Sequence, residues 1–175
     1  MDKKGFTLIE LVMILVLLGI MAAFVAPRLP NITGTKAGAF TDKLRADIRY
    51  AQNLAMTENR RTRVYFNGLN TAPIPEGYAV VIDTSATGNC GLFGPVADPS
   101  LTGNLIVTLN AGDYANVTVT PTTRCLEYDS LGRPYDCDPG ALVCTAGSAG
   151  MSVAVNANAV LVRTVTVTTV TGAVN

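Results

Sequence analysis

Glu10 is the only charged residue in an apolar run that extends over residues 6–26. A carboxylate inside such a run costs about 2.5–3.5 kcal/mol on membrane-insertion scales unless a partner neutralises it. The chemistry open to Glu10 is ion pairing, because opposite charges attract far more strongly in a low-dielectric environment than in water. Glu10 is therefore the first candidate functional residue of the chain.

Four cysteines form the second chemical set: Cys90, Cys125, Cys137 and Cys144. Because no pair has Cys-x-x-Cys spacing and the chain contains no His, a zinc site is disfavoured. All four follow the apolar run, so an exported chain would hold them in an oxidising compartment where disulfides form. A hairpin around a predicted turn at 129–134 would pair Cys125 with Cys137 and leave Cys90 with Cys144. Pairing of Cys137 with Cys144 is the alternative.

Two smaller groups of charged residues also have a functional and a structural interpretation. Asp136 and Asp138 precede a Gly, as in a calcium loop, but the other ligands of an EF-hand loop are missing, which favours a solvated turn. Arg60, Arg61 and Arg63 lie at the end of a predicted helix, where a helix C-terminus favours cations or where the side chains form a solvated face. Binding of phospholipid headgroups or DNA is the alternative for these arginines.

The composition excludes most enzyme classes. The chain has no His, which removes the commonest general base, the Ser-His-Asp and Cys-His constellations and His-based zinc sites. The sequence contains no P-loop, no GxSxG motif and no dinucleotide-binding fingerprint. We therefore predict a protein that is not an enzyme and that has neither a cofactor nor a metal site.

The charges are unevenly distributed along the 175 residues. The 13 basic and 13 acidic residues cancel overall, but residues 36–63 carry a net charge of +4 and residues 64–175 a net charge of −5. The acidic segment opposes phosphate binding and argues against nucleic acid as a partner. With 49% apolar and 15% charged residues, the chain is too apolar to be disordered.

The elements that position these residues follow from the hydrophobic pattern. The expected segments are a leader (1–5), a transmembrane helix (6–26), a kinked linker (27–38), an amphipathic helix (39–63) and a β-rich head (64–175). The apolar run reaches about 32 Å as a helix, enough for a hydrocarbon core of about 30 Å. Pro27 and Pro30 disfavour continuous helix and predict the kink. The predicted fold is α+β, with the amphipathic helix packed on the head.

Seven segments of the head have the alternation and punctuation of strands. They are residues 63–67, 78–83, 105–109, 117–120, 125–129, 151–155 and 160–170. In the last one, Val160 and Val162 share one face whereas Val165 and Val167 share the other. This change of parity predicts a β-bulge or a change of sheet near Arg163.

The N-terminal sequence resembles that of a known family. Residues 4–11, KGFTLIEL, are similar to the processing signal of type IV pilins and pseudopilins. The resemblance implies cleavage between Gly5 and Phe6 by a prepilin peptidase and methylation of the new amine of Phe6. It also implies that Glu10 pairs with this amine on a neighbouring subunit, so that the cost of burying Glu10 favours assembly.

The resemblance continues weakly into the head. Residues 40–55 and 126–134, the segment around Cys90, and the closing Thr-rich strand are similar to H-type pseudopilins and FimT-like minor pilins. Within that group the chain is most similar to minor pilins of the mannose-sensitive haemagglutinin type. Some FimT-like relatives bind DNA through a basic C-terminal segment, but residues 171–175, TGAVN, lack one.

The resemblance implies a structural subunit of a type IV pilus-like filament, with other pilin subunits, a prepilin peptidase and the inner-membrane assembly machinery as partners. The precursor is expected to be a single-pass protein of the bacterial inner membrane. The assembled subunit is expected in a surface pilus or a periplasmic filament. The alternatives are an H-type pseudopilin of type II secretion and a DNA-binding FimT-like minor pilin.

Overall fold

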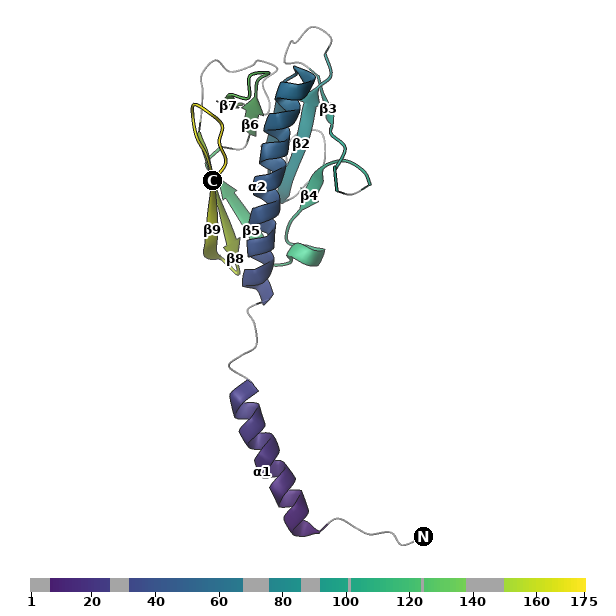
Figure 1. The fold of residues 1–175 in the computed structure, drawn as a ribbon, viewed down its shortest axis with the longest axis vertical. Helices are drawn as coiled ribbons and strands as arrows, with labels where there is room; N and C mark the ends of the chain where they lie inside the picture. The colour runs from purple at the N-terminus through teal and green to yellow at the C-terminus, as the bar shows by residue number, and fades with distance from the viewer. Residues whose placement is uncertain are drawn as a thin grey trace. The chain divides into compact units, whose positions relative to one another are not determined.

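The computed structural model describes residues 7–25, 32–67, 76–85, 92–100, 102–123, 125–137 and 150–175 (Figure 1). The chain divides into two compact units, Met1–Ile32 and Thr33–Asn175. Each unit is described by itself.

The first unit contains helix α1, Leu8–Val25. Every residue from Thr7 to residue 22 is exposed. In α1 up to that point, all but Glu10, Gly19 and Ala22 have large aliphatic or methionine side chains. Within the ranges described above, no helix has the length and apolarity needed to cross a membrane. The predicted transmembrane segment begins at Phe6 and ends at Ala26, and both of these residues lie outside the described part.

Helix α2 runs from Ile32 to Glu58, and all of it from Thr33 onward belongs to the second unit. The buried apolar residues of α2 form one stripe along the helix, as in an amphipathic helix. They recur at three- and four-residue steps and are Ala37, Phe40, Leu44, Ile48, Ala51 and Ala55. The expected linker at 27–38 is therefore too long, because the helix already includes residues 32–38. Buried Ala37 continues the buried face by about one turn toward the N-terminus of the helix. The predicted kink at Pro27 and Pro30 lies outside the described residues.

The C-terminal end of α2 also differs from the predicted end at residue 63. Asn59 adopts a left-handed conformation with φ of 51°, and the Arg60 N–H donates to the Ala55 carbonyl at 3.2 Å. This is a helix C-cap of the Schellman type, which Asn tolerates better than most residues. The chain then turns at once into a strand, and the Thr62 hydroxyl donates back to the Ala51 carbonyl at 2.8 Å.

The larger sheet is antiparallel, with strand order β3-β2-β1-β6-β7 and with β4 paired to β2. Its strands are β1 (Thr62–Phe66), β2 (Gly77–Asp83), β3 (Phe93–Pro95), β4 (Ile106–Thr108), β6 (Cys125–Tyr128) and β7 (Pro134–Asp136). Strands β3 and β7 were not predicted. Each has three residues and contains a Pro, which suits the end of a sheet but gives no alternation to detect.

The smaller sheet has the order β5-β8-β9. Its strands are β5 (Val117–Pro121), β8 (Met151–Ala157) and β9 (Val160–Val167). Val155 pairs with Arg163 whereas Asn156 pairs with Leu161, so β9 has one extra residue at this point. The bulge predicted near Arg163 is confirmed, and it brings Val165 and Val167 onto the buried face.

The core of the second unit lies between α2 and the inner faces of both sheets (Figure 1). Phe40 of α2 contacts Tyr78 of β2 and Tyr114 of a short 3-10 helix, Gly112–Tyr114, with ring centroids 5.9 and 5.2 Å apart. Val117, Val153 and Val165 supply the core residues of the smaller sheet. The predicted α+β fold, with an amphipathic helix packed on a β-rich head, is therefore confirmed.

Candidate functional site

Glu10 lies in the first turn of α1 and closes a capping box with Thr7. The Glu10 side-chain Oε2 accepts hydrogen bonds from the Thr7 backbone N–H and from the Thr7 hydroxyl, both at 3.1 Å. In return, the Glu10 N–H donates to the Thr7 hydroxyl oxygen at 3.3 Å. A Thr followed three residues later by a Glu satisfies two backbone donors at the start of a helix in this way.

The capping box changes the electrostatic account of Glu10. The carboxylate lies at the helix N-terminus, where the partial positive charge of the aligned peptide dipoles favours an anion. Both recorded bonds reach Oε2, which leaves Oε1 to accept from another group. Thr7 was not predicted as a partner of Glu10, although the Thr-x-x-Glu spacing of residues 7–10 is itself a recognisable signal of a capping box.

The other predicted N-terminal site residues, Gly5 and Phe6, lie outside the described residues. Cleavage between them and methylation of the Phe6 amine therefore remain predictions from the resemblance.

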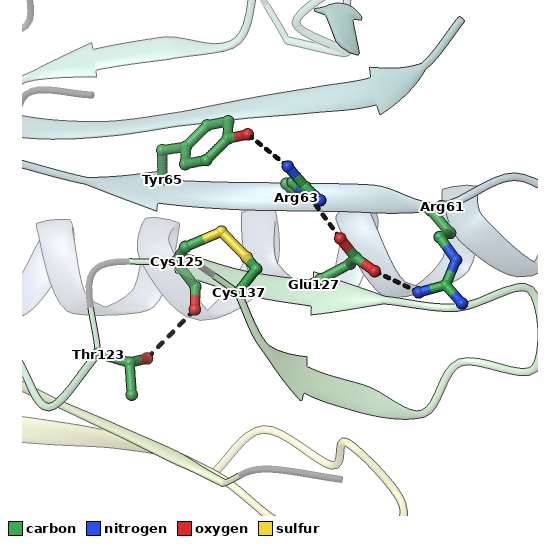
Figure 2. Close-up of a disulfide and its surroundings, with 7 residues drawn as sticks. All are labelled: Arg61, Arg63, Tyr65, Thr123, Cys125, Glu127 and Cys137. Carbon is green, nitrogen blue, oxygen red and sulfur yellow. Dashed lines mark hydrogen bonds and ion pairs between the residues drawn. A yellow bond between two sulfur atoms is a disulfide. The ribbon is translucent and has the colours of Figure 1, made fainter. Parts of the chain in front are cut away.

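A disulfide joins Cys125 at the start of β6 to Cys137 just after β7 (Figure 2). Their Cα atoms are 5.1 Å apart, and the Cys137 N–H donates to the Cys125 carbonyl at 3.4 Å. The pairing predicted from a hairpin is confirmed for these two cysteines, and the alternative pairing of Cys137 with Cys144 is wrong. Cys90 and Cys144 lie outside the described residues, so their pairing remains a prediction.

A buried ionic cluster lies beside the disulfide on the same strands (Figure 2). The carboxylate of Glu127 on β6 is fully buried and accepts from Arg63 Nε at 2.5 Å and from Arg61 Nη1. Arg63, 3% exposed, also donates to the Tyr65 hydroxyl at 3.2 Å and lies 3.9 Å above the Phe93 ring. Arg61 and Arg63, two of the three arginines expected at a solvated end of the helix, therefore form ion pairs within the head.

The surroundings of Arg63 keep its guanidinium charged. Burial alone would lower the pKa of Arg63, but the hydrogen bonds to Tyr65 and Glu127 outweigh it and raise this pKa above its ordinary value. The same bonds satisfy Glu127, which as a lone buried carboxylate would be strongly destabilising. The cluster thus fixes the register of β1 against β6, where Arg63 and Glu127 are paired residues.

Asp129 organises the turn between β6 and β7. Its Oδ1 accepts from the backbone N–H groups of Leu131 and Arg133, and its Oδ2 accepts from Arg133 Nε and the Tyr135 hydroxyl. Burial would raise the pKa of Asp129, but these hydrogen bonds outweigh it and hold the pKa below its ordinary value. The residues predicted to form a turn around Leu131 do so.

A cleft of about 450 Å³ lies between the end of α2 and this turn. Its charged residues are largely engaged within the protein: Arg61 binds Glu127, and Arg133 binds Asp129 at 2.7 Å. The Asp83 carboxylate accepts from the Ser85 hydroxyl at 2.6 Å. The described lining of the cleft therefore consists largely of ion pairs and hydrogen bonds formed within the protein.

A second polar group lies on α2 and β2. The buried Tyr78 hydroxyl donates to Asp47 Oδ2 at 2.5 Å, and Lys43 Nζ lies 3.0 Å from the same oxygen. Burial, followed by the negative charge of Asp47, raises the pKa of Tyr78 well above its ordinary value. Tyr78 is therefore a hydrogen-bond donor that anchors α2 to the sheet.

The structure was also searched for metal ligands. Within the ranges given for Figure 1, no three His, Cys, Asp or Glu side chains come together to hold a metal ion. Asp136, one of the two residues considered for a calcium loop, lies at the end of β7. Asp138 lies outside the described residues.

Comparison with known proteins points first to the N-terminus. Residues 1–26 match the family model described as the prokaryotic N-terminal methylation motif. Over 58 residues, 33% of this chain, the sequence is 38% identical to the type IV narrow pilus major component PilA5 of Thermus thermophilus. The chain spans 50% of that relative. Among solved structures, the type IV minor pilin FimU of Pseudomonas aeruginosa PAO1 is similar, with a TM-score of 0.48, 13% identity, and 83% of this chain and 91% of that chain covered.

Proposed function

We propose that this chain, a type IV pilin-like structural subunit by its N-terminal motif and its similarity to a pilus component, polymerises into a type IV pilus-like filament through α1. The observation that carries this proposal is the surface of α1. Leu8, Leu11, Leu15 and Leu18 are each more than half exposed, and so are most other large side chains of the helix. The described part of the first unit by itself offers nothing to cover this apolar helix, and an exposed apolar surface of this size is typical of a contact with lipid or with other subunits.

The proposed precursor is held in the inner membrane by residues 6–26. A prepilin peptidase removes residues 1–5 by cutting between Gly5 and Phe6, and the new amine of Phe6 is methylated. Cleavage on this side of the apolar segment removes the leader and keeps the helix that assembles. The match of residues 1–26 to the methylation motif supports this order of events.

The proposed role of Glu10 is to bind the Phe6 amine of an adjoining subunit. The capping box supports this role, because it orients the carboxylate through Oε2 and leaves Oε1 available. In a helix core that excludes water, an ammonium group at this oxygen gains strength from the low dielectric constant. The pair forms only between subunits, so it favours a fixed register of α1 against α1.

Two alternative functions differ from this proposal, one in the location of the filament and one in the ligand of the head. An H-type pseudopilin of type II secretion would use the same N-terminus in a short periplasmic filament, with the same residues in the same roles. A DNA-binding minor pilin is disfavoured, because Arg61 and Arg63 are already bound to Glu127. The segment that follows these arginines, residues 64–175, has more acidic than basic residues.

Mass spectrometry of filaments sheared from the cell surface tests the proposal. The expected result is a subunit that begins at Phe6 and carries one additional methyl group on its amine. Recovery of this species from a periplasmic fraction alone would support the pseudopilin alternative. An intact leader on assembled subunits, or a mature chain that begins after Ala26, would contradict the proposed processing.

A further inference from the structure

The turn between β8 and β9 ends in exposed apolar side chains. The last pair of the hairpin is Ala157 with Val160, and the two residues between them, Asn158 and Ala159, have φ of 51° and 63°. Two left-handed residues make a tight type I′ turn at the tip of the hairpin, and the Asn158 N–H of this turn donates to the Asn116 carbonyl at 3.0 Å. Val160 and Leu161, directly after the turn, are 66% and 58% exposed.

Two contacts, one from β9 and one from the residues that follow it, fix the direction of β9 along α2. Arg163 lies 3.4 Å from Asp42 of the helix. Further along both elements, Gln52 donates to the Thr171 carbonyl at 2.8 Å. Because both residue numbers rise together, β9 runs in the same direction as α2 and begins toward the N-terminal end of the helix (Figure 1). Leu161 is the second residue of β9.

The same end of the second unit carries the first residue of α2. Ile32 is 64% exposed, and it is the point where the chain leaves this unit toward residues 6–26. Only seven peptide bonds separate Val25 from Ile32, so covalent geometry alone limits their Cα atoms to at most about 25 Å apart. Ile32, Val160 and Leu161 are therefore apolar side chains at the end of the head from which the anchor departs.

We propose that Val160 and Leu161 form a second, shallow contact with the bilayer that holds residues 6–26 of the precursor. This inference rests on the proposed membrane-anchored precursor. Two aliphatic side chains bind an interface only weakly on their own. Because the head and the anchor belong to one chain, the contact is intramolecular, and its high effective concentration compensates for the weak affinity.

The charge beside the tip fits a lipid surface. Arg163 follows Leu161 by two residues, and its side chain is half exposed. Its ion pair with the exposed Asp42 is of the kind that contributes little in water, so the guanidinium is available to an anionic headgroup. The contact would hold the head against the membrane until the subunit is extracted into a filament.

The absence of Trp from the sequence allows a direct test. Leu161→Trp places a single fluorophore at the tip. Val170→Trp places the same fluorophore at a position that is 74% exposed, beyond the other end of β9. Because an eight-residue strand is about 26 Å long, the two reporters sample opposite ends of the head.

The full-length precursor of each variant is reconstituted into vesicles of phosphatidylcholine and phosphatidylglycerol, with and without lipids brominated near the headgroup end of their acyl chains. The emission of Leu161→Trp is expected to shift to shorter wavelength and to lose most of its intensity with brominated lipid. The emission of Val170→Trp is expected to keep its wavelength and intensity. The control also corrects for the preference of Trp itself for interfaces.

Four outcomes would overturn the inference. Equal quenching of both variants would show contact unrelated to the tip. A blue shift of Leu161→Trp without quenching would show that protein, such as a second copy, covers the tip. Unquenched Leu161→Trp in a chain that floats with the vesicles would refute the tip contact and leave the proposed anchor intact. A chain that fails to float would refute the anchored precursor itself and the tip contact with it.

Discussion

The carboxylate of Glu10 is held by Thr7 through two hydrogen bonds of 3.1 Å, one from the backbone N–H and one from the hydroxyl. Glu10 therefore has two separable properties, a helix cap and a negative charge. An amide in place of the carboxylate preserves the first and removes the second, because Gln also completes a capping box.

Variants at Thr7 and Glu10 separate these two properties. Glu10→Gln and Glu10→Ala should enter the membrane at least as well as the wild type but should fail to enter filaments efficiently. Removing one partner of a buried ion pair typically costs about 3–5 kcal/mol, because the other charge is left unpaired. Glu10→Asp should be intermediate. The measurement is the amount of variant in sheared filaments relative to its amount in the membrane fraction.

Thr7→Ala is the matched control for the cap. It removes the hydroxyl and keeps the charge, so it should cost about 1 kcal/mol of helix stability and reduce assembly much less than Glu10→Gln. Wild-type assembly of Glu10→Gln together with loss of assembly in Thr7→Ala would show that the cap, and not the charge, serves assembly.

Asp129 makes the stability of the head depend on pH in acid. Because the folded state lowers the pKa of Asp129 below its ordinary value of 3.8, the folded chain binds fewer protons here than the unfolded chain. Its contribution is complete above the ordinary value and disappears as the pH falls through the lower folded value. Urea unfolding of the wild type and of Asp129→Asn at a series of acidic pH values should therefore converge at low pH. A constant difference between the two across this range would contradict the assignment.

The disulfide between Cys125 and Cys137 should stabilise the head. The chain-entropy estimate for a loop of this length, with a sequence separation of 12, is about 3 kcal/mol. The double variant Cys125→Ala/Cys137→Ala should lose about this amount in the free energy of unfolding. In the unfolded wild type, an alkylating reagent should label these two cysteines only after reduction, and labelling without reduction would show that the exported protein does not form the bond.

Local sequence signals predicted much of the helical and strand content. The stripe from Phe40 to Ala55 predicted the packed face of α2, and the parity change in β9 predicted its bulge near Arg163. Both signals depend on residues a few positions apart. The Thr7 and Glu10 capping box is also local, so it was open to prediction.

The ionic cluster could not be predicted in the same way. Alternation placed Arg63 and Tyr65 on one face of their strand and Cys125 and Glu127 on one face of another. Which strands pair is a long-range property, and Arg63 and Glu127 are 64 residues apart. From the sequence alone, the arginines were therefore expected to lie at a solvated end of the helix. Only the pairing of β1 with β6 identifies Glu127 as their partner.

Removing the buried carboxylate of Glu127 should strongly destabilise the head. Glu127→Ala leaves Arg63 buried without its carboxylate, and such a change typically costs about 3–5 kcal/mol. The head of this chain should therefore lose a large part of its stability, because whole domains are stable by only about 5–15 kcal/mol. The measurement is urea unfolding of the full chain in detergent, followed by tyrosine fluorescence.

Two further variants show whether burial of the charge is the cause. Asp113→Ala removes an exposed carboxylate of the same unit, and a surface change of this kind should stay within about 0.5 kcal/mol. The double variant Arg63→Met/Glu127→Leu replaces the ions by apolar side chains of similar volume and should recover most of the loss. Because Arg61 also binds Glu127, recovery should be incomplete unless the Arg61 side chain moves into solvent. If Glu127→Ala unfolded at the wild-type urea concentration, Glu127 would not neutralise Arg63 in the folded head.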